Sequence, residues 1–324
     1  MAATPDDTRH ALLRRARNVS QATLDVTGLG EWQWEAPSEH GTYEVKELEA
    51  RSALTQMPPP YPGYSLNPYT GCSHACLYCY VPDVARVERP RWGSYVVVKR
   101  NLPTLLAREV KRREPSSVFL SSATDPYQPV EAEALVTRRC LEVLAGADWP
   151  LRVLTRSPLV LRDVDLLKRF SRVIVGMSVP TLDDEVRRIL EPTAPPIEGR
   201  LKTLRRLADA GLDTYVSFAP AYPLTGGVTP DDIARALAEA GVKEGWVGSW
   251  NYMTNIRGPL AERLRGTPYE HFAEQVEDKA YTRHFFRRLD YALKRRGVNL
   301  HVYLPEEAPR AVRGATRDPL GMDI

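Results

Sequence analysis

The sequence predicts an α/β protein whose core is a partial, TIM-like (β/α)6 barrel with an extension at each end. From residue 65 onward, short β-like runs alternate with helical stretches, and such alternation is typical of a parallel sheet with right-handed crossovers. A cysteine-rich loop follows the first predicted strand, at the strand end where barrels of this kind carry their chemistry. The length of 324 residues allows one large domain with additions or two small domains.

The strand candidates are short apolar runs bounded by loop residues. They are 65–70, 117–121, 151–155, 172–178, 214–218 and 245–249. The stretches between them have apolar residues at three- and four-residue spacing, as at Leu201, Leu204 and Leu207, which predicts amphipathic helices. These helices are 102–113, 132–145, 164–169, 198–210 and 230–240.

The two extensions are predicted from changes in pattern. Residues 1–62 form an N-terminal extension that ends in the proline-rich stretch 57–62, where the prolines break regular structure and favour a linker or a wrapped arm. Residues 63–255 form the barrel core, and residues 256–324 the C-terminal extension. In that extension a long helical pattern over 268–296 precedes an apolar alternation over 300–304, which we expect to cap or extend the barrel.

Composition describes an ordinary soluble protein, with 43% hydrophobic and 26% charged residues. No apolar run approaches the length of a membrane span, and the first 20 residues contain no apolar segment typical of a secretory signal. Four cysteines in a chain of this size do not indicate a disulfide scaffold. We therefore expect a cytoplasmic protein that does not associate with membranes.

Basic residues gather in four short runs, although the net charge of +3 is too small to imply a nucleic-acid partner by itself. The runs are 111–113, 205–206, 287–288 and 294–296. Such runs are usually solvated helix faces, and a nucleic-acid substrate is the alternative.

Three cysteines at a spacing of three residues and then two are the most informative feature of the chain. Cys72, Cys76 and Cys79 occur within one loop, and thiolates are the usual ligands of a [4Fe-4S] cluster, which takes four. Three ligands from the protein leave one iron open to a small molecule. A zinc site that uses the same cysteines with His74 or a distant histidine is the alternative, but structural zinc motifs usually contain two short knuckles, and the sequence has one.

The pattern Cys-x-x-x-Cys-x-aromatic-Cys, with Tyr78 as the aromatic residue, resembles the signature of radical S-adenosylmethionine (SAM) enzymes. The resemblance implies that the three cysteines hold a [4Fe-4S] cluster and that SAM chelates the fourth iron. An electron from the cluster would cleave SAM into methionine and a 5'-deoxyadenosyl radical, which abstracts a hydrogen atom. The electron donor implied is reduced flavodoxin or ferredoxin.

Further segments resemble the spore photoproduct lyase-like branch of radical SAM proteins, namely 72–80, 124–126, 154–158 and 175–179. This resemblance implies that Thr124 and Asp125 contact the amino group of SAM and that Ser178 approaches its amino acid moiety. Arg156 stands where the branch commonly has lysine, and its guanidinium would pair with the methionine carboxylate. Tyr78 would pack near the adenine. From position alone, Asp125 is equally consistent with a helix-capping role.

One departure argues against the best-known reaction of that branch. In photoproduct lyases a cysteine immediately precedes the Ser/Thr-Asp pair and returns a hydrogen atom, whereas this sequence has Ala123. Cys140 shares a helical face with Val136 and Leu144, which predicts a buried packing role. Tyr78 and Tyr80 match the aromatic pair around the third cysteine of the lyases and are the candidate catalytic residues.

Weaker candidates lie further along the chain. Glu191 would reach the hydroxyls of SAM or pair with an arginine, and pairing is the commoner outcome. The sixth strand ends in Trp246, Trp250, Asn251 and Tyr252, which would face the substrate side. The aromatic side chains among them would stack a base or pack against the last helix.

The sequence therefore predicts a radical SAM enzyme with a lyase- or transferase-like reaction and an unknown, macromolecular substrate. Repair of a DNA photolesion is one alternative. A metal- or nucleic-acid-binding module without catalysis, holding an iron-sulfur cluster or zinc, is the other.

Overall fold

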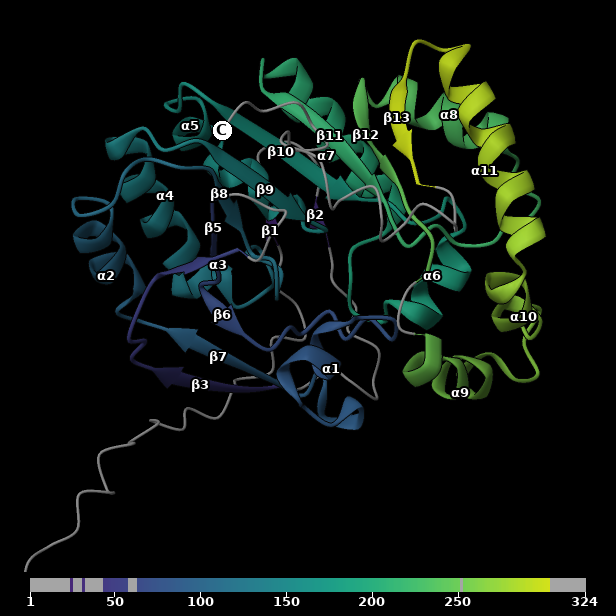
Figure 1. Ribbon diagram of the computed structural model, residues 1–324, viewed down its shortest axis with the longest axis horizontal. Helices are drawn as coiled ribbons and strands as arrows, with labels where there is room; N and C mark the ends of the chain where they lie inside the picture. Colours follow the sequence, from purple (N-terminus) through teal and green to yellow (C-terminus); the bar gives the residue numbers. More distant parts are fainter. Residues whose placement is uncertain (1–23, 26–30, 33–42, 58–62, 251–252, 304–324) are drawn as a thin grey trace, which may run out of the picture.

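Eight strands form the main sheet, in the order β13-β12-β11-β10-β9-β8-β5-β4 (Figure 1). The computed structural model describes residues 24–25, 31–32, 43–57, 63–250 and 253–303. The strands are β4 (Leu54–Gln56), β5 (Tyr64–Leu66), β8 (Val118–Leu120), β9 (Leu151–Thr155), β10 (Val173–Ser178), β11 (Asp213–Phe218), β12 (Glu244–Val247) and β13 (Asn299–Val302). All neighbours are parallel except β4 and β5. Within the described residues β4 and β13 are not paired with each other, so the predicted partial barrel is confirmed and it stays open.

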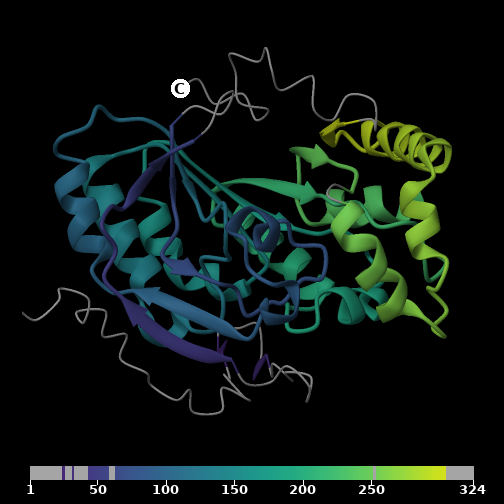
Figure 2. The same ribbon diagram turned by 60° about the horizontal axis from the view of Figure 1, so that its bottom comes forward.

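Helices connect and flank these strands. They are α2 (Leu102–Glu109), α3 (Glu131–Ala134), α4 (Val136–Ala147), α5 (Val164–Leu167), α6 (Asp184–Leu190), α7 (Ile197–Asp209), α8 (Pro230–Glu239), α9 (Met253–Leu264), α10 (Phe272–Glu277) and α11 (Lys279–Lys294). In Figures 1 and 2 the strands lie between α2 and α4 at one end of the sheet and α8 and α11 at the other. None of the helices in the described ranges combines the length and apolar character that crossing a bilayer requires.

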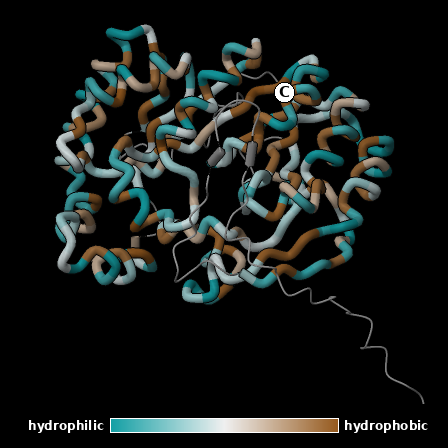
Figure 3. The backbone as a smooth tube through the Cα atoms, turned by 180° about the vertical axis from the view of Figure 1, so that it is seen from behind, coloured by the Kyte–Doolittle hydropathy of each residue, from teal (hydrophilic) through white to brown (hydrophobic). Residues whose placement is uncertain are grey.

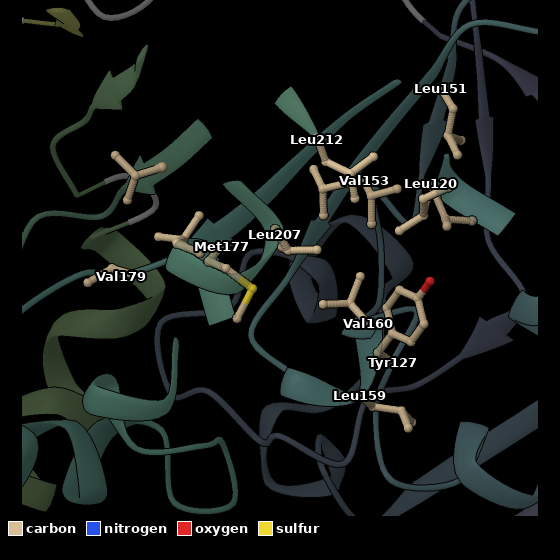
Figure 4. Close-up of a cluster of buried hydrophobic side chains, with 14 of the residues drawn as sticks. Leu120, Tyr127, Leu151, Val153, Leu159, Val160, Met177, Val179, Leu207 and Leu212 are labelled. Atoms are coloured by element: carbon tan, nitrogen blue, oxygen red, sulfur yellow. The ribbon is translucent and has the colours of Figure 1, made fainter. Parts of the chain in front are cut away.

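The core forms where apolar strand residues meet the apolar faces of these helices. Leu204 and Leu207 of α7 are fully buried, as their predicted spacing requires, and burying such a side chain stabilises the fold by roughly 2 kcal/mol. Figure 4 shows Val153 of β9 near Leu120 of β8, and Val160, which follows β9, belongs to the same buried cluster. Along the outer helices, hydrophobic and hydrophilic residues follow each other at short intervals (Figure 3), as expected of helices with one buried face.

A second sheet of three strands was not predicted. It has the order β3-β7-β6 and consists of β3 (Glu44–Leu48), β7 (Tyr95–Lys99) and β6 (Tyr69–Thr70). The prediction of one strand over 65–70 is wrong, because Pro68 has no N–H group and restricts the residue before it. β5 therefore pairs with β8 in the main sheet, while β6 pairs antiparallel with β7.

Two predicted helices are each divided in the structure. The helix predicted over 132–145 breaks at Leu135, which has a left-handed φ of 55° between α3 and α4. The helix predicted over 268–296 breaks at Asp278, whose carboxylate accepts hydrogen bonds from the backbone N–H groups of Ala280 and Tyr281. Asp278 thus caps α11 and satisfies two of its free N–H groups.

Both predicted extensions contribute strands to the main sheet. β4 pairs with β5, and β13 pairs with β12, so each extension adds one strand to an edge of the core sheet. The proline-rich residues 58–62 lie outside the described residues. The division at residues 62 and 255 stays a prediction.

Candidate active site

The cysteine loop begins where β6 ends and turns sharply at Gly71. Gly71 has a φ of 81°, and a Cβ atom there would lie 2.4 Å from the backbone oxygen of Tyr95, so glycine is required both by conformation and by space. Cys72 and Cys76 are buried, Cys79 is half-buried, and none of them forms a disulfide. α1 (Val81–Ala85) follows the loop directly.

A cavity of about 350 Å³ brings the predicted site residues together. It lies at the carboxyl ends of the parallel strands, and its lining includes Leu154 of β9, Ser178 of β10 and Trp246 of β12. All nine predicted site residues line it, namely Cys72, Cys76, Tyr78, Cys79, Tyr80, Thr124, Asp125, Arg156 and Ser178. This is the end of the barrel at which enzymes with such sheets carry their catalytic residues.

The donor groups of this cavity fit an iron-sulfur cluster with a polar ligand beside it. Three free thiols match the ligand type of such clusters. The hydroxyls of Ser121, Thr124 and Ser178 are buried and have no hydrogen-bond partner within the described residues, although hydroxyls can both donate and accept. No three His, Cys, Asp or Glu side chains in the described chain are placed to hold a single metal ion. A cluster does not need that convergence, because each cysteine binds a different iron.

Burial makes the three thiols poor acids in the absence of iron. Burial, with the nearby negative charge of Asp125, raises the pKa of Cys72 to about 12. Burial also raises the pKa of Cys76 and of Cys79. Because thiolates are the ligand form, positive charge from bound iron would have to stabilise them.

Asp125 is held by the protein on both carboxylate oxygens. Its Oδ1 accepts hydrogen bonds from the Thr155 hydroxyl at 2.6 Å and the Tyr127 N–H at 2.9 Å. Its Oδ2 accepts one from the Arg156 N–H at 2.8 Å and lies 3.3 Å from Nε2 of His74. Burial by itself would raise the pKa of Asp125, but His74 and these hydrogen bonds lower it to about 2. With four partners the carboxylate has little capacity left for SAM, so the geometry favours a positioning role.

Glu191 pairs with two arginines and with the cysteine loop. The Tyr78 hydroxyl donates to Oε1 of Glu191, and Nε of Arg156 lies 3.4 Å from the same oxygen. Nη2 of Arg156 also donates to the Tyr78 hydroxyl at 3.1 Å. Arg200 donates to Oε2 of Glu191, and both side chains are 0% exposed. Glu191 therefore pairs with arginine, which is the commoner of the two outcomes expected for it.

Arg200 and the residues around the α6–α7 connection form hydrogen bonds that support β10 and the cysteine loop. Arg200 also donates to the Ser178 carbonyl at 2.9 Å, which fixes the end of β10. The Leu77 N–H donates to the Leu190 carbonyl at 2.9 Å, and the Thr193 hydroxyl donates to the Ser73 carbonyl. The end of α6 and the connection that follows it thus hold the cysteine loop at Ser73, Leu77 and Tyr78.

Stability is expected to fall in acid as Glu191 becomes protonated. Burial would raise the pKa of Glu191, but the charges of Arg200 and Arg156 outweigh it and lower the pKa to about 2 from 4.5. A carboxyl whose pKa is lower in the folded state stabilises the fold above its unfolded pKa and loses that contribution as pH falls. The free energy of unfolding in urea, measured from pH 6 down toward about pH 2, should decline below roughly pH 4.5. The free energy of unfolding of the Glu191→Gln variant should decline less steeply as the pH falls. The same decline in the variant and the wild type would contradict this assignment.

Tyr78 packs in an aromatic cluster that covers the cysteine loop. Its ring lies edge-on to Tyr222 at 5.8 Å and Trp250 at 5.3 Å, and Phe272 of α10 contacts the rings of both Tyr222 and Trp250. Cys76 belongs to the same buried cluster. The segment beyond residue 255 therefore helps to shield the loop from water.

The remaining residues discussed from the sequence lie in different environments. Tyr80 is 41% exposed and its hydroxyl donates to the Ser122 carbonyl. Ala123 lines the cavity, and Cys140 is fully buried in the core, which confirms its packing role. Asn251 and Tyr252 lie outside the described residues.

Sequence reasoning missed two residues that support the loop. The Gln128 side chain accepts a hydrogen bond from the Ser73 N–H at 3.0 Å and donates to the Gly71 carbonyl at 3.3 Å. Arg200 was predicted only as part of a helix. Gln128 stands two residues after the segment 124–126, so its closeness to Asp125 in sequence could have identified it, whereas Arg200 left no such signal.

A family model described as "Radical SAM superfamily" matches residues 66–240, which include the cysteine loop and the strands β8 to β11 that surround the cavity. The chain belongs to the radical SAM superfamily. Members use a [4Fe-4S] cluster together with SAM, and the geometry of the thiols and hydroxyls agrees with that pair of cofactors.

Several relatives share the matched region. An uncharacterized protein of Methanocaldococcus jannaschii is 34% identical over 182 residues, covering 56% of this chain and 68% of the relative. An uncharacterized protein of Mycobacterium tuberculosis is 33% identical over 60% of this chain and 62% of its own length. A protein of Pseudomonas phage M6 named radical SAM Nalpha-GlyT isomerase is 28% identical over 60% of this chain and 40% of its length. The match thus leaves a third or more of some relatives uncovered.

Among solved structures the fold is similar to that of spore photoproduct lyase. Its complex with a dinucleoside spore photoproduct superposes with a TM-score of 0.53 at 16% identity, covering 81% of this chain and 82% of the lyase. At that identity the likeness extends to the fold alone.

Proposed function

We propose that this protein uses a [4Fe-4S] cluster bound by Cys72, Cys76 and Cys79 to cleave SAM reductively and to abstract a hydrogen atom from a macromolecular substrate. The observation that carries the proposal is a cavity at the carboxyl ends of the strands, where three free thiols meet hydroxyls that have no hydrogen-bond partner among the described residues. The open sheet supports a large substrate, because β4 and β13 leave one side of the described barrel unclosed.

The side chains around the thiols have distinct tasks in this proposal. The bound cofactors supply an electron and a 5'-deoxyadenosyl radical. Thr124 and Ser178 offer hydroxyls to the charged groups of the methionine part of SAM. Arg156, oriented by Glu191 and Tyr78, pairs with a carboxylate. Asp125 holds the backbone of Arg156, and the cluster of Tyr78, Tyr222 and Trp250 keeps water from the loop.

Anaerobic reconstitution with iron and sulfide tests the proposal. The protein should bind about four irons per chain and show the absorption of an iron-sulfur cluster. With dithionite and SAM it should form 5'-deoxyadenosine, and reduced flavodoxin or ferredoxin should replace dithionite. One bound zinc, no cluster absorption and no 5'-deoxyadenosine would overturn the proposal in favour of a binding module.

Repair of a DNA photolesion is the second candidate, supported by the fold shared with a lyase whose structure contains a dinucleoside photoproduct. Ala123 counts against it, because a methyl side chain at the cavity wall has no readily transferable hydrogen. A tyrosine would have to act instead, and the hydroxyls of Tyr78 and Tyr80 both already form hydrogen bonds within the protein. Irradiated DNA that keeps its lesions after incubation with reduced enzyme and SAM would remove this candidate.

A further inference from the structure

Two stacked aromatic rings form part of the barrel interior beside the cavity. The rings of Tyr215 and Trp246 have centroids 5.1 Å apart and planes 28° apart. Ser217 and Trp246 are partners in the parallel register of β11 and β12, and Ser217 and Tyr215 share one face of β11 because side chains alternate along a strand. Ser217 and Trp246 both line the cavity, so this face of the two strands is the interior one.

Gly176 provides the space in which Tyr215 lies. Gly176 is the register partner of Tyr215 in β10, and a Cβ atom there would lie 2.2 Å from Cζ of the tyrosine ring. The ring therefore lies across the glycine and is fully buried. With Tyr215 beneath one face, the half-buried indole of Trp246 is held in one orientation at the cavity wall. Gly176, Tyr215 and Trp246 are called the Trp246 platform below.

The surroundings of the platform define the kind of group that it accepts. The lining contains six aromatic side chains, Tyr78, Tyr80, Trp92, Phe119, Trp246 and Trp250. Besides the cysteines and tyrosines its ionisable residues are Asp125 and Arg156, and both are engaged by protein partners. The other polar residues there carry hydroxyls, including Ser217 and Ser249. A planar, uncharged group with hydrogen-bonding atoms on its edge suits such a wall.

A nucleobase has these properties together, because its faces stack on aromatic rings and its edge both donates and accepts hydrogen bonds. The aromatic side chains of a peptide offer the face, but phenylalanine has no polar atom on its edge, and tyrosine and tryptophan have one each. Bases inside a duplex are covered on both faces by their neighbours, so a base on the platform must be single-stranded or extruded.

We propose that the Trp246 platform binds a nucleobase of the substrate, in a single-stranded or extruded nucleotide. The inference rests on the proposed function and names its substrate class as nucleic acid. The platform holds the base by stacking, and the hydroxyls beside it contact the edge of the base. The ring is thereby fixed in the same cavity as the three cysteines.

Binding of a fluorescein-labelled, mixed-sequence single-stranded DNA of twelve nucleotides tests the inference. Fluorescence anisotropy is measured on the reconstituted enzyme with SAM and without reductant, so that no turnover occurs. Stacking on one ring is expected to be worth about tenfold in Kd, so Trp246→Ala should raise Kd by about that factor, while Trp246→Phe should raise it by less than about threefold. Gly176→Ala should weaken binding through the displaced Tyr215 ring. Tyr291→Ala, which removes an exposed aromatic ring on α11 outside the cavity, should bind like the wild type.

Several results would overturn the inference. The first is that the wild type does not bind the DNA. The second is that Trp246→Ala retains its iron and binds the DNA with an unchanged Kd. The third is that this variant loses affinity for SAM while its affinity for DNA is unchanged. Tighter binding of a phenylalanine-containing peptide than of the DNA would assign the platform to a protein substrate. Formation of 5'-deoxyadenosine by the wild type is measured in parallel. If it forms while DNA fails to bind, the platform assignment alone is wrong, and if it does not form, the proposed function itself fails.

Discussion

Cys76→Ala is expected to abolish both the bound cluster and the formation of 5'-deoxyadenosine from SAM. Cys76 is buried in the cavity, and its loss leaves two thiols where the proposed cluster needs three from the protein. Iron analysis, the absorption spectrum and chromatography of the reaction products measure the effect. Product should fall to the detection limit while circular dichroism shows that the fold is kept.

Cys140→Ala is the matched control for that variant. Cys140 is also a free, fully buried cysteine, but it packs in the core on α4 and does not line the cavity. It should keep the full iron content and the wild-type rate, at a stability cost of about 1 kcal/mol. A cluster that survives Cys76→Ala, or that disappears in Cys140→Ala, would contradict the assignment of the three loop cysteines.

Arg200→Met is expected to lower the free energy of unfolding by about 3–5 kcal/mol. The substitution leaves Glu191 buried without its closest cation and removes the donor to the Ser178 carbonyl. An uncompensated charge in a site that water does not reach is costly. Equilibrium unfolding in urea under anaerobic conditions measures the change. The freed Glu191 should also hold Tyr78 and Arg156 less firmly, which should lower the rate of 5'-deoxyadenosine formation.

Lys202→Met, on the same helix, is the control that removes an exposed ion pair in place of a buried one. Lys202 pairs with Glu198 at the surface, where the two side chains are 55% and 73% exposed. Exposed pairs of this kind contribute little, so the free energy of unfolding should change by less than about 0.5 kcal/mol. Similar losses in the two variants would show that the burial of Glu191 and Arg200 is not what makes their pairing important.

The strands of the barrel could be predicted because they are buried runs between loop residues. The prediction over 151–155 coincides with β9, and the other strands after the first overlap β8, β10, β11 and β12. The sheet formed by β3, β7 and β6 could not be predicted in the same way. β3 is polar and half-exposed, and it pairs with β7 about fifty residues away, as between Glu44 and Tyr95. Its stability comes from that distant partner and not from its own pattern.

Some features of the site could likewise be predicted from the sequence, and others could not. The cysteines, Thr124 and Ser178 were predicted from short motifs, because ligands on one loop and residues at strand ends keep a fixed spacing in sequence. The engagement of Asp125 by Thr155, Tyr127 and Arg156 was not predictable from its motif. Only the folded chain brings three hydrogen-bond donors and the imidazole of His74 around one carboxylate.

The alternation of strands and helices and the spacing of the three-cysteine loop could be predicted from the sequence alone. These features depend on periodicity and spacing, which act over a few residues. The tertiary structure decided which side chains support the loop. Tyr78 meets Glu191 across 113 positions of sequence, and Arg200 joins Glu191 to the end of β10. Buried charges must find partners wherever the fold brings them together, so their pairing is a property of the packed barrel and not of any local pattern.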